Sequence, residues 1–467
     1  MVIGIVISLF LLMWVAYRGY NVIFFAPFLG LFAAVTAGFP IFPTYTEIFM
    51  PALANYAKTY FPVFILGAVF GKIMEESGAA QAIAHWIMKS LGAKMAIPAV
   101  VLSAAVLTYG GVSLFVVAFA VYPFAAAVFK EGDIPKRLLP GSIALGSFTA
   151  TMTAFPGTPQ IQNLIPVKYF QTDAFAAPVI GVLGGIMMFG FGLLWLEYRK
   201  KTMLARGENY GSMHNFINEP DATKLANENG QLNPFLAMIP LLSVLILNKV
   251  FTNMMSAWDQ TAIQAIPALK TTSVASSHPI WALVAALVIG IVLTLIIGWK
   301  QIKTEANAIK AINAGAIGSL LAIMNTASET GYGNIIKSLP GFKVVADFML
   351  SIDPGTPLVS EAIAVNVLAG ITGSASGGMS IALEAMGKTY LDWGNRVGVD
   401  PQLLHRIAAM SSGGMDSLPH NGAVITLLAI TGLTHKSSYP DIGMCSVVIP
   451  FVVTFICIFL NVMFGII

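Results

Sequence analysis

Two titratable side chains stand close together in a glycine- and serine-rich stretch in the last quarter of the chain. Asp416 and His420 lie within Ser411–Gly422, which interrupts an apolar run from Ile407 to Leu433. A carboxyl group that is removed from water gains proton affinity, and an imidazole can titrate near neutrality. Asp416 is therefore a candidate for ion or proton coupling, with the capping of the following half-helix as the structural alternative. His420 either takes part in proton transfer or hydrogen-bonds a ligand.

A matching stretch, Thr151–Gln160, lies in the first half of the chain. Gly and Pro interrupt helices, and in lipid the released peptide groups are tolerated only where protein or a water-filled cavity surrounds them. Helix N-termini at such breaks favour a carboxylate, while hydroxyl and amide side chains can hold hydroxyl groups of a ligand. The candidate ligand-binding residues in the two stretches and in two further Gly/Ser-rich centres are Thr108, Ser113, Thr153, Thr158, Gln160, Ser374, Ser376, Ser417, His420 and Asn421.

No Arg or Lys lies in these four stretches. We therefore expect an anion to be held by helix dipoles and His420, which favours a small monoanion over a di- or tricarboxylate. The alternative is that the small residues only allow close helix packing. Glu361 and Glu384 are secondary candidates for coupling, and because the corresponding parts of the first half hold no acid, we expect coupling in the second half. Glu76 and Glu329 are expected to occupy equivalent positions of the two repeats, near the ends of crossings, and are interpreted as structural capping or pairing groups.

Composition identifies the elements that must position these groups. Of 467 residues, 57% are hydrophobic and 10% are charged, against about 25% charged residues in soluble domains. The sequence predicts an all-α polytopic membrane protein in the lipid bilayer. A net charge of +3 indicates no nucleic-acid partner, and Cys445 and Cys457 are expected to be inert. The histidines are scattered along the sequence, which argues against a metal site, a cofactor and an intramembrane enzyme. The sequence has no GxxxxGK[ST] motif, which argues against an ATP-driven pump. A channel stays an alternative, because polar hairpins also line pores.

Apolar runs divide the chain into two similar halves, 1–197 and 232–467, joined by a polar linker at 198–231. The first half is expected to hold crossings at Val2–Ala16, Val22–Phe39 and Tyr60–Gly78, a re-entrant hairpin at about 97–129, a broken helix at about 138–166 and a last crossing. The second half is expected to hold three crossings, a hairpin at about 355–386, a broken helix at about 407–433 and a last crossing. Five crossings per half would make the repeats inverted relative to each other.

Basic residues predict the orientation. The linker opens with Arg199, Lys200 and Lys201, which places it in the cytoplasm by the positive-inside rule. Both termini then lie on the external face, the first hairpin enters from the cytoplasm and the second from outside. Arg406 is among the basic residues that fall outside. The N-terminal segment is expected to be a first membrane helix because it has no basic region or cleavage site.

Two motifs resemble a known family. The run Ala154–Pro166, AFPGTPQIQNLIP, and the run Gly413–Gly422, GGMDSLPHNG, resemble the gluconate permease (GntP) family within the ion-transporter superfamily. The resemblance covers the whole chain and is strongest to members described as 3-hydroxybutyrate permeases. It implies proton symport of small hydroxy acids, such as gluconate, 3-hydroxybutyrate or D-serine, across a bacterial inner membrane. It also implies a homodimer in which a transport domain moves as an elevator against a scaffold.

The function expected from the sequence is uptake of a small hydroxy-carboxylate, first D-3-hydroxybutyrate, with protons. The alternatives are a permease for gluconate or other sugar acids and a sodium-coupled carboxylate transporter.

Overall fold

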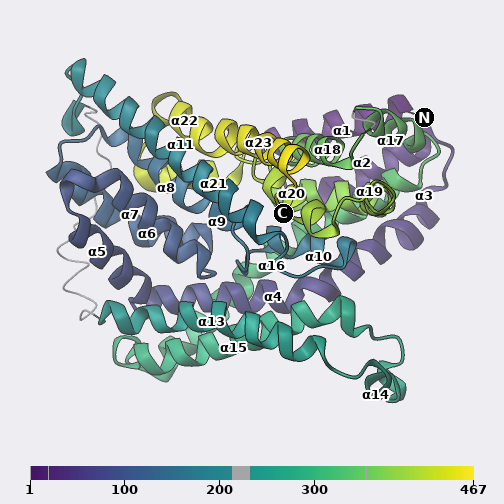
Figure 1. Cartoon of the computed structure of the whole chain (residues 1–467), viewed down its shortest axis with the longest axis horizontal. Coiled ribbons are helices and arrows are strands. Elements are labelled where there is room, and N and C mark those ends of the chain that lie inside the picture. Colours follow the sequence, from purple (N-terminus) through teal and green to yellow (C-terminus); the bar gives the residue numbers. More distant parts are fainter. Residues whose placement is uncertain (1, 19, 213–231, 353–354) are drawn as a thin grey trace.

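The computed structural model describes all residues except 1, 19, 213–231 and 353–354. Within the described ranges every regular element is a helix (Figure 1). Six stretches are long and apolar enough to cross a membrane: residues 41–76, which end in α4 (Met50–Glu76); α11 (Pro178–Ala205); α13 (Pro234–Ser256); most of α15 (Val274–Ile302); α16 (Glu305–Ser338); and residues 435–464, which comprise α22 (His435–Gly443), η7 (Met444–Val448) and α23 (Ile449–Phe464). At 1.5 Å per residue each of them reaches the roughly 30 Å of a hydrocarbon core. The prediction of an all-α polytopic membrane protein is confirmed.

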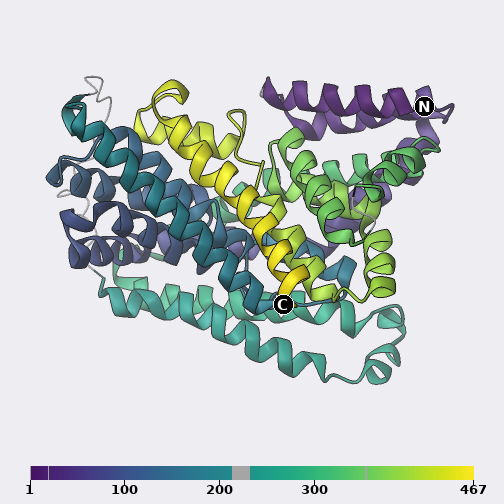
Figure 2. The same cartoon turned by 45° about the horizontal axis from the view of Figure 1, so that its top comes forward.

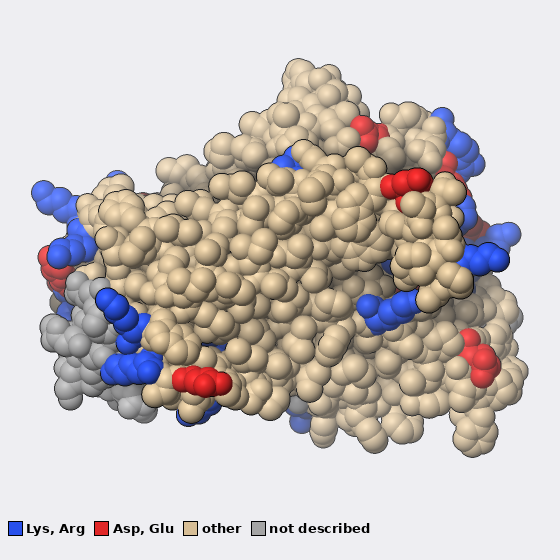
Figure 3. Space-filling model, turned by 90° about the horizontal axis from the view of Figure 1, so that it is seen from below, with Lys and Arg blue, Asp and Glu red and all other residues tan. Residues whose placement is uncertain are grey.

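The surface agrees with burial in a bilayer. Figure 3 shows the face formed by α13 and α15, where charged side chains gather mainly toward the two ends and a wide uncharged band lies between them. Many large apolar side chains of these helices are exposed, among them Ile246 and Ile296. An uncharged band of this kind is suited to contact with lipid chains.

The two N-terminal helices are short for helices that cross a membrane. α1 (Val2–Tyr17) has 16 residues and α2 (Val22–Thr36) has 15, so they span only about 24 and 22 Å. The turn before Asn21, which caps α2, and the left-handed Gly38 after α2 limit their length. They form a helical pair (Figure 2), and α2 packs against α16. α1 ends one residue beyond its predicted crossing, and α2 ends three residues before the end of its predicted crossing. That these two helices cross the bilayer stays a prediction.

Each Gly/Ser-rich centre forms the turn of a helical hairpin. The first hairpin joins α6 (Ala96–Tyr109) to α7 (Leu114–Glu131), and the second joins α18 (Pro357–Thr372) to α19 (Ala375–Val397). Gly111 and Gly373 take left-handed conformations in the turns, with φ of 98° and 65°, which is the region that favours glycine. The hairpins lie toward opposite ends of the long helices α4, α13 and α15, with α5 (Ala79–Leu91) beside the first (Figures 1 and 2).

Two further helices are interrupted. α8 (Leu139–Ser147) and α9 (Ala150–Thr153) precede an irregular stretch, 154–164, that leads through η4 (Ile161–Asn163) to α10 (Ile165–Phe170). α20 (Pro401–Ser412) is separated from α21 (Gly422–Thr431) by residues 413–421. We call 154–164 the first break and 413–421 the second break. Prolines and glycines inside both stretches prevent a continuous helix.

The two halves share a register of about 263 residues. The first arms of the hairpins end at Tyr109 and Thr372, 263 positions apart, and α4 and α16 end at Glu76 and Ser338, 262 positions apart. Glu329, however, is 253 positions from Glu76 and lies inside α16. The expected equivalence of Glu76 and Glu329 is therefore wrong, because a match of small residues around each Glu is ten positions out of register. The inverted relation of the halves in the bilayer stays a prediction.

The predicted linker at 198–231 begins as helix, because α11 continues to Ala205. A 3-10 turn, η5 (Tyr210–Ser212), follows, and the remainder, 213–231, lies outside the described residues.

Candidate functional site

The tip of the first hairpin packs on the first break. The Gln160 amide donates to the carbonyl of Thr108 over 2.8 Å, and the Tyr109 hydroxyl donates to the carbonyl of Pro156 over 2.7 Å. A Cβ on Gly111 would lie 2.9 Å from Pro159 Cγ, so the two backbones approach closely. The hydroxyls of Thr108 and Thr158 are buried here and have no hydrogen-bond partner among the described residues. Two polar groups are thus available for a ligand at this contact.

The tip of the second hairpin packs on the second break in the same way. The Asn421 amide donates to the Gly373 carbonyl over 2.8 Å, while its oxygen accepts from the first amides of α21. The imidazole of His420 lies directly against Gly373, where a Cβ would meet it at 2.8 Å. Asn366, on the first arm, directs its buried amide oxygen at Gly414. Asn366 was missed by the sequence analysis because a single Asn in an apolar helix gives no motif.

A fully buried arginine joins α20 to the first break. Arg406 on α20 makes five hydrogen bonds of 2.7–3.4 Å: to the carbonyls of Thr153, Ala174 and Ala176 (twice), and to the side-chain oxygen of Asn163. No carboxylate lies within salt-bridge distance of it in the described part of the chain. A guanidinium group offers five donors in a planar fork, which suits this set of acceptors, and it stays charged in the interior.

Arg406 adds a basic group that the sequence analysis did not consider. No Arg or Lys lies in the four Gly/Ser-rich stretches, and an anion was expected to be held by helix dipoles and His420. The structure brings the positive charge of Arg406 to the backbone of Thr153, and Thr153 itself packs against Gly413 of the second break. The sequence holds a signal that was not recognised, because Arg406 directly precedes the apolar run that begins at Ile407. A charged residue in such a place can be buried in the protein when enough carbonyl acceptors surround it.

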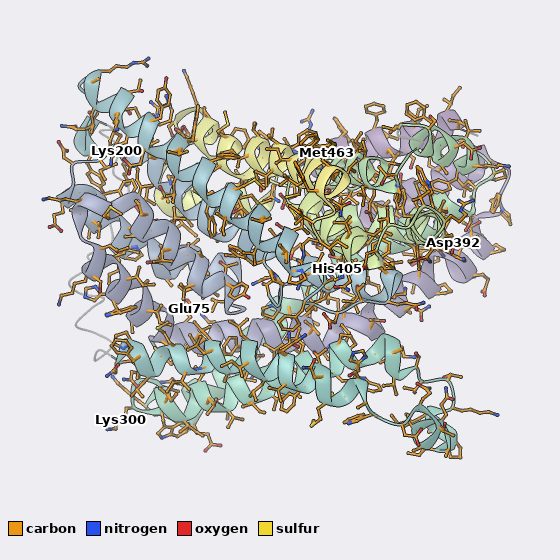
Figure 4. The ribbon with its side chains drawn as sticks, viewed as in Figure 1. Glu75, Lys200, Lys300, Asp392, His405 and Met463 are labelled. Carbon is orange, nitrogen blue, oxygen red and sulfur yellow. The ribbon has the colours of Figure 1, made fainter. Side chains whose placement is uncertain are left out.

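His405, next to Arg406, belongs to the same network. It is fully buried, with Nδ1 2.6 Å from the Thr172 hydroxyl and Nε2 3.4 Å from the Asn163 amide oxygen. Asn163 also donates to the carbonyls of Thr158 and Ala174. Figure 4 shows His405 between the end that carries Lys200 and Lys300 and the end that carries Asp392. This network fixes the first break to α20, so the breaks are held as one unit.

The predicted hydroxyl groups of the hairpins and breaks are partly occupied. Ser113 and Ser374 cap α7 and α19, accepting from Val116 and Gly377. The Thr153 hydroxyl donates to the Thr149 carbonyl. Ser376 lies 3.2 Å from the Thr326 hydroxyl of α16 and 3.4 Å from the Ser374 hydroxyl. These contacts build the turns, so the residues left for direct ligand contact are fewer than the sequence suggests.

The acidic candidates occupy different places. Asp416 is 8% exposed in the second break and accepts from the Ser417 hydroxyl over 3.0 Å. Glu361 is fully buried on α18, and neither of its oxygens has a partner among the described residues. Glu384 lies apart from both: it accepts from the Tyr169 hydroxyl over 2.8 Å and is 3.8 and 3.9 Å from Lys168 and Lys337. Asp416 and Glu361 remain groups that protonation could neutralise, whereas Glu384 has charged partners.

The two hairpins reach different depths along the long helices. The first hairpin meets α4 near its end, where a Cβ on Gly71 would lie 3.9 Å from Val112 Cα. The second hairpin meets α16 much further from its end, through the contact of Ser376 with Thr326. In the 263-residue register Thr326 corresponds to Val63, eight residues from Gly71. Eight residues of helix span about 12 Å, so the hairpins are offset by about that distance from a symmetric arrangement.

An open pocket of about 810 Å³ lies beside the Glu384 cluster. Lys58 and Lys168 line it, together with hydroxyl and amide side chains from α4 and from the segment before α15. Its two lysines give this pocket a basic character.

Helices long enough to span a bilayer and a buried polar centre made of paired hairpins and helix breaks define an integral membrane transporter, not an enzyme. Comparison with known proteins makes the class specific. A model of the GntP family permeases matches residues 1–463, and the chain belongs to this family.

Known relatives agree with this assignment. The chain is 48% identical over 447 residues to the uncharacterized transporter YxjC of Bacillus subtilis, covering 94% of both chains. It is 25% identical over 375 residues to the high-affinity gluconate transporter of Escherichia coli, covering 77% of this chain and 75% of that one. The crystal structure of the YdaH transporter of Alcanivorax borkumensis is similar in fold, with a TM-score of 0.55 at 14% identity over 88% of each chain.

Proposed function

We propose that this permease takes up a small hydroxy-carboxylate together with protons, with D-3-hydroxybutyrate as the first candidate substrate. The observation that carries the proposal is that each hairpin tip packs on a helix break, that Thr153 joins the two breaks at Gly413, and that Arg406 brings a buried positive charge to Thr153. The resemblance of Ala154–Pro166 to 3-hydroxybutyrate permeases supports the short substrate.

The charge of the site supports an anionic ligand. Arg406 is held by carbonyls and an amide, so its positive charge is not cancelled by a direct carboxylate partner in the described residues. The unoccupied hydroxyls of Thr108 and Thr158 add donors. A ligand with one carboxylate and one or more hydroxyl groups would satisfy this set.

The movement in the proposal is a sliding of the hairpins and breaks, as one unit, along α4 and α16. Its support is the unequal depth of the two hairpins along α4 and α16. If the two similar halves alternate between two states, each hairpin should take in one state the position that the other hairpin takes in the other state. The homodimer implied by the resemblance would supply a fixed frame for this movement.

Coupling is assigned to Asp416 in the proposal. It is nearly buried and lies next to the ligand-binding break, so it would be carried through the membrane at lower cost when protonated. Glu361 is the second candidate because it too is buried without a charged partner.

The experiment is a competition panel in proteoliposomes that hold the purified protein, with labelled D-3-hydroxybutyrate as the transported compound. Unlabelled 3-hydroxybutyrate should compete, and its methyl ester should not, because the ester removes the anionic charge and keeps the rest of the molecule. Equal competition by the ester would refute an anion site.

Gluconate is the second candidate substrate, because the chain is related to a high-affinity gluconate transporter over three quarters of its length. Stronger competition by gluconate than by 3-hydroxybutyrate in the same panel would select it. A substrate change of this kind would leave the anion site and the coupling residues in place.

A further inference from the structure

We propose that Glu329 on α16 is a proton-binding group, and that its protonation allows the second hairpin to dock against α16. This step goes beyond the coupling role given to Asp416 and rests on the proposed function only in that the hairpins move. The sequence analysis interpreted Glu329 as structural, by analogy with Glu76.

The carboxyl group of Glu329 lies directly against the backbone of the second hairpin. A Cβ on Gly377 would be 2.3 Å from the Glu329 carboxyl carbon, so only glycine leaves room for it. Glu329 is 2% exposed, and its Oε2 has no hydrogen-bond partner among the described residues. Docking of the hairpin therefore encloses a carboxyl group without a counter-charge.

The surroundings of Glu329 contain hydroxyl groups and, among the described residues, no cation. Tyr56 on α4 is close enough to Glu329 to interact with it electrostatically, and the hydroxyls of Ser380 and Thr326 lie beside the Tyr56 hydroxyl. α2 contributes no titratable side chain, and Glu47 before α4 is exposed. On α16 itself the Tyr332 hydroxyl is 2.6 Å from the Ser8 hydroxyl.

The nearest charged cluster lies further along the second arm of the hairpin. Glu384 is seven residues beyond Gly377, and the lysines within 4 Å of it, Lys168 and Lys337, are 46% and 45% exposed. These lysines contact Glu384 and not Glu329. An ionised Glu329 would thus be buried without a compensating positive charge, which is unfavourable, whereas the protonated acid can donate to a neighbouring hydroxyl.

The corresponding positions of the first half carry no polar groups. In the 263-residue register the counterparts of Glu329, Gly377 and Ser380 are Leu66, Leu114 and Val117. A purely structural contact between α16 and the hairpin could use the same apolar residues. The acid and its glycine partner in the second half therefore point to a role in sensing protons.

The consequence is a state-dependent proton site. In the present arrangement the second hairpin covers Glu329, and the protonated carboxyl is favoured. A slide of the hairpin by about 12 Å along α16 would uncover the group, which could then release its proton to water. Low pH should therefore favour the docked state, and rising pH should favour the undocked state.

The test measures the docked population directly and requires no substrate, so failure of the proposed uptake activity would not affect its result. Spin labels are attached at Ile317→Cys on α16 and Lys388→Cys on α19, which replace side chains that are 69% and 83% exposed. The native cysteines are both buried. Distance distributions are recorded by double electron–electron resonance in lipid nanodiscs between pH 5 and pH 8.

With an otherwise unchanged chain, the ratio of docked to undocked protein should fall by up to tenfold per unit of rising pH, the limit for one proton. Glu329→Gln and Glu329→Leu should be docked at every pH. Glu76→Gln is the matched control, because Glu76 is half exposed and pairs with Lys72 at 3.1 Å; it should keep the original pH dependence.

Three results would overturn the proposal: a docked population that does not depend on pH, the original pH dependence retained in both Glu329 variants, or a shift that follows sodium concentration and not pH. Thermal unfolding of each variant in the same lipid shows whether it is folded, and Glu329→Leu keeps the test decisive if Glu329→Gln is unstable.

Discussion

The sliding of the hairpins can be tested with pairs of cysteines placed by the register of the two halves. Two pairs are close in the present arrangement. A Cβ on Gly71 would lie 3.9 Å from Val112 Cα, and a Cβ on Gly333 would lie 3.1 Å from Ile381 Cα. Gly71→Cys with Val112→Cys, and Gly333→Cys with Ile381→Cys, should therefore form disulfides readily.

The register predicts which pairs become close after sliding. Position 71 corresponds to 334 and 112 to 375, while 333 corresponds to 70 and 381 to 118. Phe70→Cys with Ala118→Cys, and Asn334→Cys with Ala375→Cys, should then cross-link only after the hairpins move by about 12 Å, the length of eight helical residues.

The assay is oxidative cross-linking in membranes, followed by transport before and after reduction. We expect all four pairs to cross-link in active protein, each cross-link to stop net transport, and reduction to restore it. If Phe70/Ala118 and Asn334/Ala375 never cross-link while the other two pairs do, or if the cross-linked protein still transports, the hairpins do not slide in this way.

Three further predictions concern single residues. Asp416→Asn, which imitates the protonated acid, should exchange labelled substrate across the membrane but fail to accumulate it against a gradient; loss of exchange as well would indicate the capping role. Arg406→Lys has three donors in place of five, so at least one of the four buried acceptors loses its partner at about 1–3 kcal/mol. Its thermal unfolding in detergent should occur at a clearly lower temperature than that of Lys388→Ala, an exposed control; an unchanged midpoint would contradict the role of Arg406 in joining α20 to the first break. Gly377→Ala should impair transport and lower the unfolding temperature, because its methyl group collides with Glu329. Adding Glu329→Ala should restore the native helix packing, measured as the unfolding temperature. An equal loss of unfolding temperature in the single and double variants would place the strain elsewhere.

The sequence could predict what depends on local composition. Apolar runs located the long helices, and paired glycines and prolines located the turns at Gly111 and Gly373 and the interruptions at Pro156 and Pro419. The family motifs are also local, and the family prediction is confirmed. These features follow from backbone preferences and hydrophobicity, which a single sequence records.

Features that depend on contacts between distant segments were not predicted. Arg406 lies inside because carbonyls of residues 153, 174 and 176, more than 200 positions away, converge on it. Glu329 differs from Glu76 because another hairpin covers it, although the short motifs around the two residues are alike. Apolar composition alone also placed the end of α2 three residues too far along the chain, because the helix ends before Gly38.

The most direct test of the central claim is uptake driven by a pH gradient alone. Purified protein is reconstituted into proteoliposomes with an alkaline interior and an acidic exterior, without sodium, and labelled D-3-hydroxybutyrate is added outside. The account predicts accumulation above the external concentration, abolished by a proton ionophore and reduced by competing hydroxy acids. Uptake that only reaches the external concentration, or accumulation that requires a sodium gradient, would contradict proton-coupled transport of a hydroxy-carboxylate.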